Sequence, residues 1–87
     1  MQANDTSRVK KYEYIRFVEA PQMGITTRWD CWSHRDGYLG QVKWYGPWRQ
    51  YCYFGQEGTV FSLGCLSDIR DFIGWLMKER KLRAKGS

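Results

Sequence analysis

Residues 38–54 constrain the fold more than any other stretch of this chain. They form two runs of aromatic and β-branched residues on either side of Gly46-Pro47. Such side chains are typical of a pleated, half-buried strand surface, and a Gly-Pro pair between two such runs is typical of a turn. The segment therefore predicts two antiparallel strands, 38–45 and 48–54, against which the other elements must pack.

The size of the chain makes large buried side chains important. Its 87 residues are enough for one domain. A domain of this size buries only about 60–65% of the surface that its unfolded form exposes. Five Trp residues and an aromatic content of 17% supply large side chains for the core. The formal net charge of +5 favours an acidic partner such as nucleic acid, although charge governs the encounter and not the fold.

The cysteines and the single histidine exclude several kinds of site. Cys31, Cys52 and Cys65 are odd in number and widely spaced, which argues against a disulfide framework. With only His34 beside them, the chain lacks the ligands of a zinc site, and no cofactor is predicted. Reduced thiols, together with the lack of a bilayer-spanning apolar run or a signal-peptide core, predict a cytoplasmic protein that does not bind membranes.

Two further strands precede the central pair. Residues 12–19 alternate between apolar and polar side chains, and residues 25–33 do so after a break at Pro21. The sequence Arg35-Asp36-Gly37 predicts a hairpin turn, because glycine accepts the positive φ that such turns require. Residues 59–61 are compatible with a short fifth strand.

The pattern changes to that of a helix after Ser62, a residue suited to cap a helix N-terminus. Over residues 63–81 the apolar positions recur at helical spacing and form one stripe of ordinary core-facing width. Gly74 and Trp75 fall outside that stripe.

The order of these elements predicts an α+β fold. Sequential strands joined by short turns form a four-stranded antiparallel β-meander, and the C-terminal helix packs on one of its faces. The polar residues 1–11 predict a disordered N-terminal segment, residues 12–81 a single domain, and residues 82–87 a basic tail.

Strand alternation divides the sheet residues into two faces. The set predicted to face the helix consists of Ile15, Phe17, Trp29, Cys31, Val42, Trp44, Cys52 and Phe54. The opposite set combines aromatic and cationic side chains: Tyr14, Arg16, Arg28, Trp32, Lys43, Tyr45, Arg49, Tyr51 and Tyr53. Aromatic rings on a sheet stack on unpaired bases at about 1–3 kcal/mol per base, while Arg and Lys contact the phosphates. This face predicts a binding surface for nucleic acid, preferably single-stranded.

Other interpretations of these residues stay open. The same rings suit a homodimer interface or cross-strand ladders in which Arg stacks on Tyr, and a bulge would exchange the two faces beyond it. Trp75, beside Gly74 on the outer side of the helix, predicts a contact with a protein partner, for example a host protein bound by a phage factor. A surface Trp folded over its neighbours explains Trp75 equally well.

The sequence predicts no enzyme. Asp68 and Asp71 lie one helical turn apart near a helix N-terminus, where the helix dipole explains them. Ser33, His34 and Asp36 are neighbours in one turn, whereas a catalytic triad needs a spatial relay. The predicted function is a non-enzymatic binding protein for nucleic acid, with a protein-interaction module as the alternative.

Three strings of the sequence resemble a group of small uncharacterised proteins from bacteria and their phages. They are residues 39–54, Thr59-Val60-Phe61 and Cys65-Leu66-Ser67-Asp68-Ile69. The resemblance covers roughly residues 29–76 and implies a bacterial or phage cytoplasmic protein, but it implies no activity. The chain departs from the pattern of the group after Tyr53-Phe54, where Gly55 replaces an expected Pro.

The order of the elements is also similar to that of the single-stranded-DNA-binding transcriptional coactivators and the plant Whirly proteins. Those proteins use a curved basic-aromatic sheet and assemble through the elements around it. The similarity implies a fold and a mode of binding by analogy, and it assigns no residue.

Overall fold

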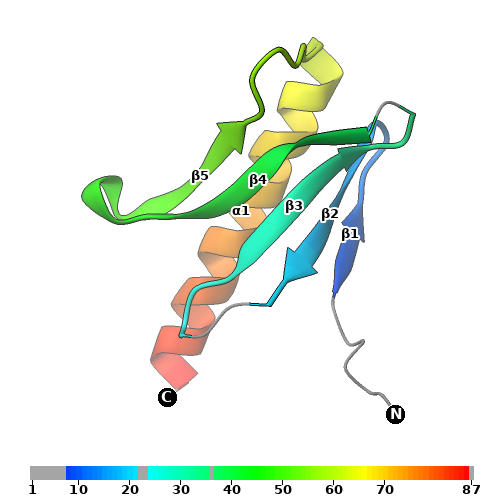
Figure 1. Cartoon of the computed structure of the whole chain (residues 1–87). Coiled ribbons are helices and arrows are strands. Elements are labelled where there is room, and N and C mark those ends of the chain that lie inside the picture. Colours follow the sequence, from blue (N-terminus) through cyan, green and yellow to red (C-terminus); the bar gives the residue numbers. More distant parts are fainter. Residues whose placement is uncertain (1–7, 22–23, 36, 87) are drawn as a thin grey trace.

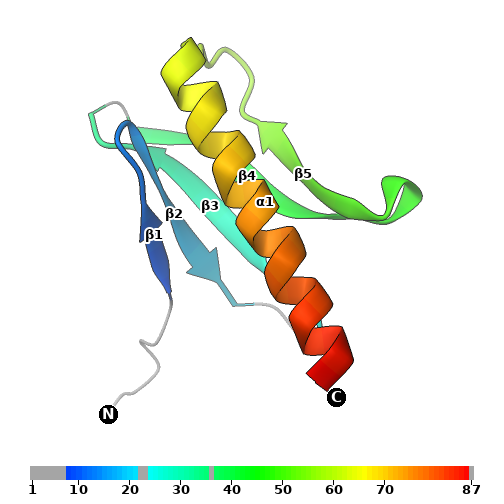
Figure 2. The ribbon, with the colours of Figure 1, turned by 180° about the vertical axis from the view of Figure 1, so that it is seen from behind.

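The computed structural model describes residues 8–21, 24–35 and 37–86, with side chains as far as residue 82. Within these ranges the elements are β1 (Val9–Lys11), β2 (Ile15–Ala20), β3 (Arg28–Ser33), β4 (Gly37–Tyr45), a short 3-10 turn (Gly46–Trp48), β5 (Gln50–Gly55) and α1 (Leu63–Gly86). The strands form one antiparallel sheet in chain order, and α1 lies across one face of it (Figures 1 and 2). The predicted α+β class and antiparallel meander are confirmed.

The sheet gains its fifth strand at the N-terminus and not at residues 59–61, which have no regular structure. β1 belongs to the segment that was predicted to be disordered, of which residues 1–7 lie outside the described ranges. It forms an antiparallel pair with β2, in which Lys10 lies opposite Phe17. At the other end, residues 82–86 continue α1 and do not form a separate tail.

Arg8 joins the N-terminal strand to both layers of the domain. Its guanidinium donates hydrogen bonds to Glu19 of β2, with Nε 3.0 Å from Oε1, and to Glu79 of α1. The same group lies 5.1 Å from the centre of the Trp29 ring. The hydrogen bond to Glu19, and to a smaller extent the one to Glu79, raises the pKa of Arg8, so the guanidinium stays protonated in the folded state. These contacts explain why a segment of polar residues adds a strand to the sheet.

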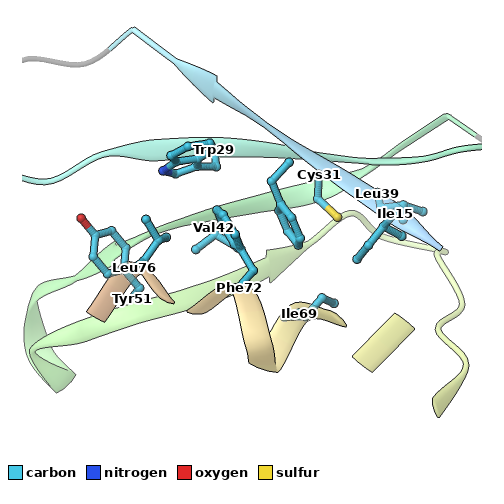
Figure 3. Close-up of a cluster of buried hydrophobic side chains, with 10 residues drawn as sticks. Ile15, Trp29, Cys31, Leu39, Val42, Tyr51, Ile69, Phe72 and Leu76 are labelled. Atoms are coloured by element: carbon cyan, nitrogen blue, oxygen red, sulfur yellow. The ribbon is translucent and has the colours of Figure 1, made fainter. Parts of the chain in front are cut away.

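The hydrophobic core fills the space between α1 and the sheet (Figure 3). Its buried residues are Ile15, Phe17, Trp29, Cys31, Leu39, Val42, Tyr51, Ile69, Phe72 and Leu76. Phe72 lies at the centre, where its ring stacks on Phe17 with 3.9 Å between ring centres and meets Trp29 edge-on. Of the apolar stripe predicted for the helix, Ile69, Phe72 and Leu76 are buried, whereas Leu66, which was also predicted to face the core, is 51% exposed. Ser62 caps the helix as predicted, because its Oγ accepts a hydrogen bond from the Cys65 N–H at 3.2 Å.

Candidate nucleic-acid interface

The face of the sheet that points away from α1 is here called the open face. Paired residues of neighbouring antiparallel strands share a face, so the strand register fixes its membership. In the part of the chain that the structure describes, no helix or strand lies over it (Figure 1). Its aromatic and cationic residues are Lys11, Arg16, Arg28, Trp32, Tyr38, Lys43, Tyr45 and Phe54.

One row of the open face crosses four strands. It consists of Lys11, Arg16, Trp32 and Tyr38, each paired with the next. The Arg16 guanidinium lies 5.8 Å from the centre of the Trp32 ring, and Tyr38 meets that ring at 5.3 Å between centres. The row therefore places aromatic rings on β3 and β4 directly beside cations on β1 and β2.

A second aromatic group lies where β4 turns into β5. The Tyr45 ring meets that of Trp48 at 5.2 Å between centres and that of Phe54 at 6.0 Å. Lys43 Nζ lies 4.7 Å from the centre of the Phe54 ring. The Trp48 side chain is 67% exposed, so this group is open to a ligand. Its residues line a pocket of about 250 Å³ formed by Tyr45, Trp48, Cys52, Tyr53 and Phe54.

The structure places part of the predicted set on the open face. Those residues are Arg16, Arg28, Trp32, Lys43 and Tyr45. Arg49 lies beside the face, exposed at the β4–β5 turn, with a left-handed backbone at φ 53°. Sequence reasoning missed Lys11, Tyr38, Trp48 and Phe54. Aromatic character alone could have suggested the last three, but their face depends on details of the turn and of the strand register.

The residues of β5 face the opposite sides of the sheet from those predicted. Tyr45 pairs with Gln50 across a turn formed by residues 46–49, so even-numbered residues of β4 share a face with odd-numbered residues of β5. Tyr51 and Tyr53 consequently face α1 and pack in or against the core, so their predicted place on the nucleic-acid face is wrong. Cys52 and Phe54, which were predicted to face the helix, lie on the open face.

The Tyr51 hydroxyl belongs to a buried polar network. Its oxygen accepts a hydrogen bond from the Thr27 N–H at 3.0 Å, and the Trp29 Nε1–H donates to Thr27 Oγ1 at 2.8 Å. The Tyr51 side chain is only 3% exposed. The network joins β5 to the segment that leads into β3.

Tyr51→Phe should therefore destabilise the domain. The substitution leaves the buried Thr27 N–H without its acceptor, which costs about 1–3 kcal/mol. Urea denaturation followed by circular dichroism measures the loss. Tyr45→Phe on the open face is the matched control and should change the free energy of unfolding by less than about 0.5 kcal/mol. Equal effects of the two substitutions would contradict the core position of Tyr51.

A bulge keeps Tyr38 beside Trp32 on the open face. The register of β3 and β4 shifts between Cys31 and Trp32, opposite Leu39 and Gly40. A Cβ on Gly40 would lie within 2.8 Å of the Tyr53 hydroxyl, so no side chain fits there. That hydroxyl donates a hydrogen bond to the Leu39 carbonyl at 2.9 Å. The bulge thereby turns Leu39 into the core while Tyr38 stays outside.

Tyr14 does not belong to the open face, contrary to the prediction. β2 begins only at Ile15, and the Tyr12 N–H donates to the Ile15 carbonyl in a tight turn, so strand alternation does not reach Tyr14. Its ring lies against Gly64 of α1, where a Cβ would come within 2.4 Å of a ring carbon. Its N–H donates to the Asp68 carboxylate at 3.1 Å. Through these two contacts, Tyr14 packs the β1–β2 turn against the start of the helix.

Trp75 is half-buried and not exposed on the outer side of the helix as predicted. Its ring meets Trp29 at 5.8 Å between centres. Lys10 Nζ lies 4.6 Å from the ring centre, and the Arg8 guanidinium lies 5.6 Å from it. The prediction lacked β1, which carries Lys10 and directly follows Arg8. The predicted contact of Trp75 with a protein partner assumed an exposed ring, and that assumption does not hold. Gly74, next to it, does have open space around it.

His34 and Cys31 hold structural positions in the fold. The Nε2–H of His34 donates to the Tyr12 carbonyl at 2.9 Å, as expected for a histidine in a turn. Burial raises the pKa of the Cys31 thiol to about 12, which leaves it protonated and unreactive. Over the ranges that the structure describes, no group of three His, Cys, Asp or Glu side chains is placed to hold a metal ion. In the same ranges, no helix is long and apolar enough to cross a bilayer.

Comparison with known proteins finds a phage relative. The chain is 37% identical to an uncharacterised 9.3 kDa protein of Acholeplasma phage L2 over 75 residues, which span 84% of this chain and 96% of the phage protein. No family model matches the chain. No solved structure matches it either, so the similarity to the coactivators and Whirly proteins stays a prediction. The chain therefore belongs to the same family as the uncharacterised 9.3 kDa protein of Acholeplasma phage L2.

Proposed function

We propose that this protein binds single-stranded nucleic acid through the open face. The observation that carries the proposal is the pairing of rings with cations at both ends of that face. Arg16 lies over Trp32 at one end, and Lys43 lies over Phe54 at the other. Each pair offers a flat surface for a base and a positive charge for the adjoining phosphate.

The composition of the open face separates it from an ordinary solvated face. A solvated face of an antiparallel sheet carries mostly polar side chains, whereas rings of this size are usually buried. Here Trp32, Tyr38 and Phe54 lie on the side of the sheet that is not packed against α1. Stacking with bases is worth about 1–3 kcal/mol for each ring, enough for useful affinity when several rings contribute.

The preference for single strands follows from the aromatic rings on the surface. Bases in a duplex are stacked on one another and cannot lie flat on protein rings, whereas unpaired bases can. The open face also carries Asp30, which pairs with Gln41 between the two aromatic groups. A carboxylate and an amide at this place suit hydrogen bonds with base edges, because both accept from exocyclic amino groups.

Titration of the intrinsic Trp fluorescence with a single-stranded oligonucleotide of about twelve nucleotides tests the proposal. We expect saturable quenching, because Trp48 is 67% exposed and the partly exposed Trp32 ring lies on the open face, so bases can stack on both rings. With four contacted phosphates, the affinity should fall about 50-fold between about 50 mM and about 200 mM salt. Trp32→Ala should weaken binding about tenfold by removing one stacking platform.

The control is Leu63→Ala, a substitution of an 84% exposed side chain at the start of α1, which should leave the titration unchanged. Absence of quenching at low salt, where a protein of charge +5 binds acidic ligands most readily, would contradict the proposal. A protein partner bound to the same aromatic face would then be the better account, and its apolar contact would depend little on salt.

A further inference from the structure

The pocket described above is formed by residues of the β4–β5 hairpin alone. The end of this hairpin projects sideways beyond α1 in both views of the ribbon (Figures 1 and 2). The pocket volume of about 250 Å³ is below the range of about 300–1,000 Å³ that drug-sized ligands occupy. The pocket is therefore of a size for one small ring system.

The turn holds the rings of the pocket at steep angles to one another. The planes of Tyr45 and Trp48 meet at 85°, and those of Tyr45 and Phe54 at 65°. The turn is closed by a hydrogen bond from the Arg49 N–H to the Gly46 carbonyl at 3.0 Å. A flat ligand can stack on one wall and meet the next wall edge-on, which is the arrangement that aromatic systems prefer.

The charges around the pocket decide between two classes of flat or compact ligand. Three aromatic rings could also hold an organic cation. However, Lys43 Nζ already lies 4.7 Å from the centre of the Phe54 ring, and the exposed Arg49 follows Trp48 in the turn. A second cation would be repelled, whereas a ligand with a phosphate next to an aromatic base would be attracted.

We infer that this pocket receives a single unpaired base of the bound strand, with the neighbouring phosphate on Lys43. The inference deepens the proposed function and rests on it. From Tyr45, β4 runs about 23 Å to Tyr38 in the row that contains Trp32, at about 3.3 Å per residue. A strand of roughly four to six nucleotides covers this length, so the pocket fixes one end of the strand and the row contacts the other.

A thiol in the pocket provides a direct readout. Cys52 lines the pocket and is half-buried, and Cys65 of α1 is similarly half-buried but on the helix. We propose alkylating the full chain with iodoacetamide and following each cysteine peptide by mass spectrometry. A saturating single-stranded oligonucleotide of thymidine should slow the modification of Cys52 at least fivefold and leave the rate at Cys65 unchanged.

Trp48→Ala provides the second readout. It should weaken binding of the single strand about tenfold and leave the weaker binding to a duplex of equal length unchanged, because a duplex has no free base to insert. Val60→Ala, at a side chain that is 88% exposed and outside the pocket, is the matched control and should change neither affinity.

The possible failures of this experiment are distinguishable. If wild-type protein binds the single strand, but Cys52 stays fully reactive and Trp48→Ala binds within twofold of wild type, the pocket is empty in the complex and the inference is wrong while the proposed function stands. If the fluorescence titration shows no binding at low salt, the proposed function fails and the inference fails with it.

Discussion

Phe72→Ala should destabilise the domain by about 3–5 kcal/mol. The Phe72 ring is fully buried, stacks on Phe17 at 3.9 Å between centres, and meets the Trp29 and Tyr12 rings edge-on. Removing a buried Phe side chain costs about 3–5 kcal/mol, because the transfer free energy is lost and a cavity remains. A domain of 87 residues has a total stability of roughly 4–13 kcal/mol, so this one change removes much of it.

Urea denaturation followed by far-ultraviolet circular dichroism measures this effect. Phe72→Leu keeps most of the buried volume and should lose much less stability than Phe72→Ala. Leu66→Ala on the same helix is the matched surface control, since that side chain is 51% exposed, and it should cost less than about 0.5 kcal/mol. A midpoint for Phe72→Ala within error of wild type would show that the core is not built around this ring.

The elements with strong local patterns were predictable from the sequence. The helical spacing of Ile69, Phe72 and Leu76 identified the stripe that α1 buries. Ser62 was identifiable as a cap because it precedes an apolar helical pattern. The β3–β4 hairpin followed from Gly37, whose φ of +100° is the positive value that such turns need. Each of these features is decided by residues close together in the chain.

β1 was not predictable because its stability comes from distant contacts. The segment around Arg8 is polar, and local composition favours disorder there. The contact that gives it structure is an ion pair with Glu79, which lies 71 residues further along the chain. The half-buried position of Trp75 was missed for the same reason, because it depends on Lys10 of this strand.

The composition of the open face was only partly predictable because alternation gives the period of a strand but not its phase. The phase of β5 depends on how many residues the preceding turn contains. That number depends on Arg49, which adopts a left-handed backbone that propensity assigns to glycine or asparagine. The place of Tyr38 similarly depends on the bulge at Gly40. Residues before the turn, such as Arg16, Trp32 and Lys43, were placed correctly.

Reversing two charges of the open face, Arg16→Glu with Lys43→Glu, should nearly abolish binding of the single strand. Each substitution removes a phosphate contact and puts a carboxylate in its place, and like charges brought together at an interface cost several kcal/mol. We expect the affinity at low salt to fall more than about 100-fold. Loss of two phosphate contacts should also reduce the slope of log affinity against log salt by about 1.4.

The matched control for this double variant is Lys78→Glu with Lys81→Glu, at exposed positions of α1. Both double variants change the net charge by the same amount, so they differ only in which surface loses its cations. Circular dichroism should show an unchanged fold for both. At about 0.1 M salt the control should keep its affinity within about threefold, because exposed charges farther than the Debye length of about 10 Å are then largely screened. Equal losses in the two variants would mean that the overall charge of the protein attracts the strand, and that the open face has no special part in holding it.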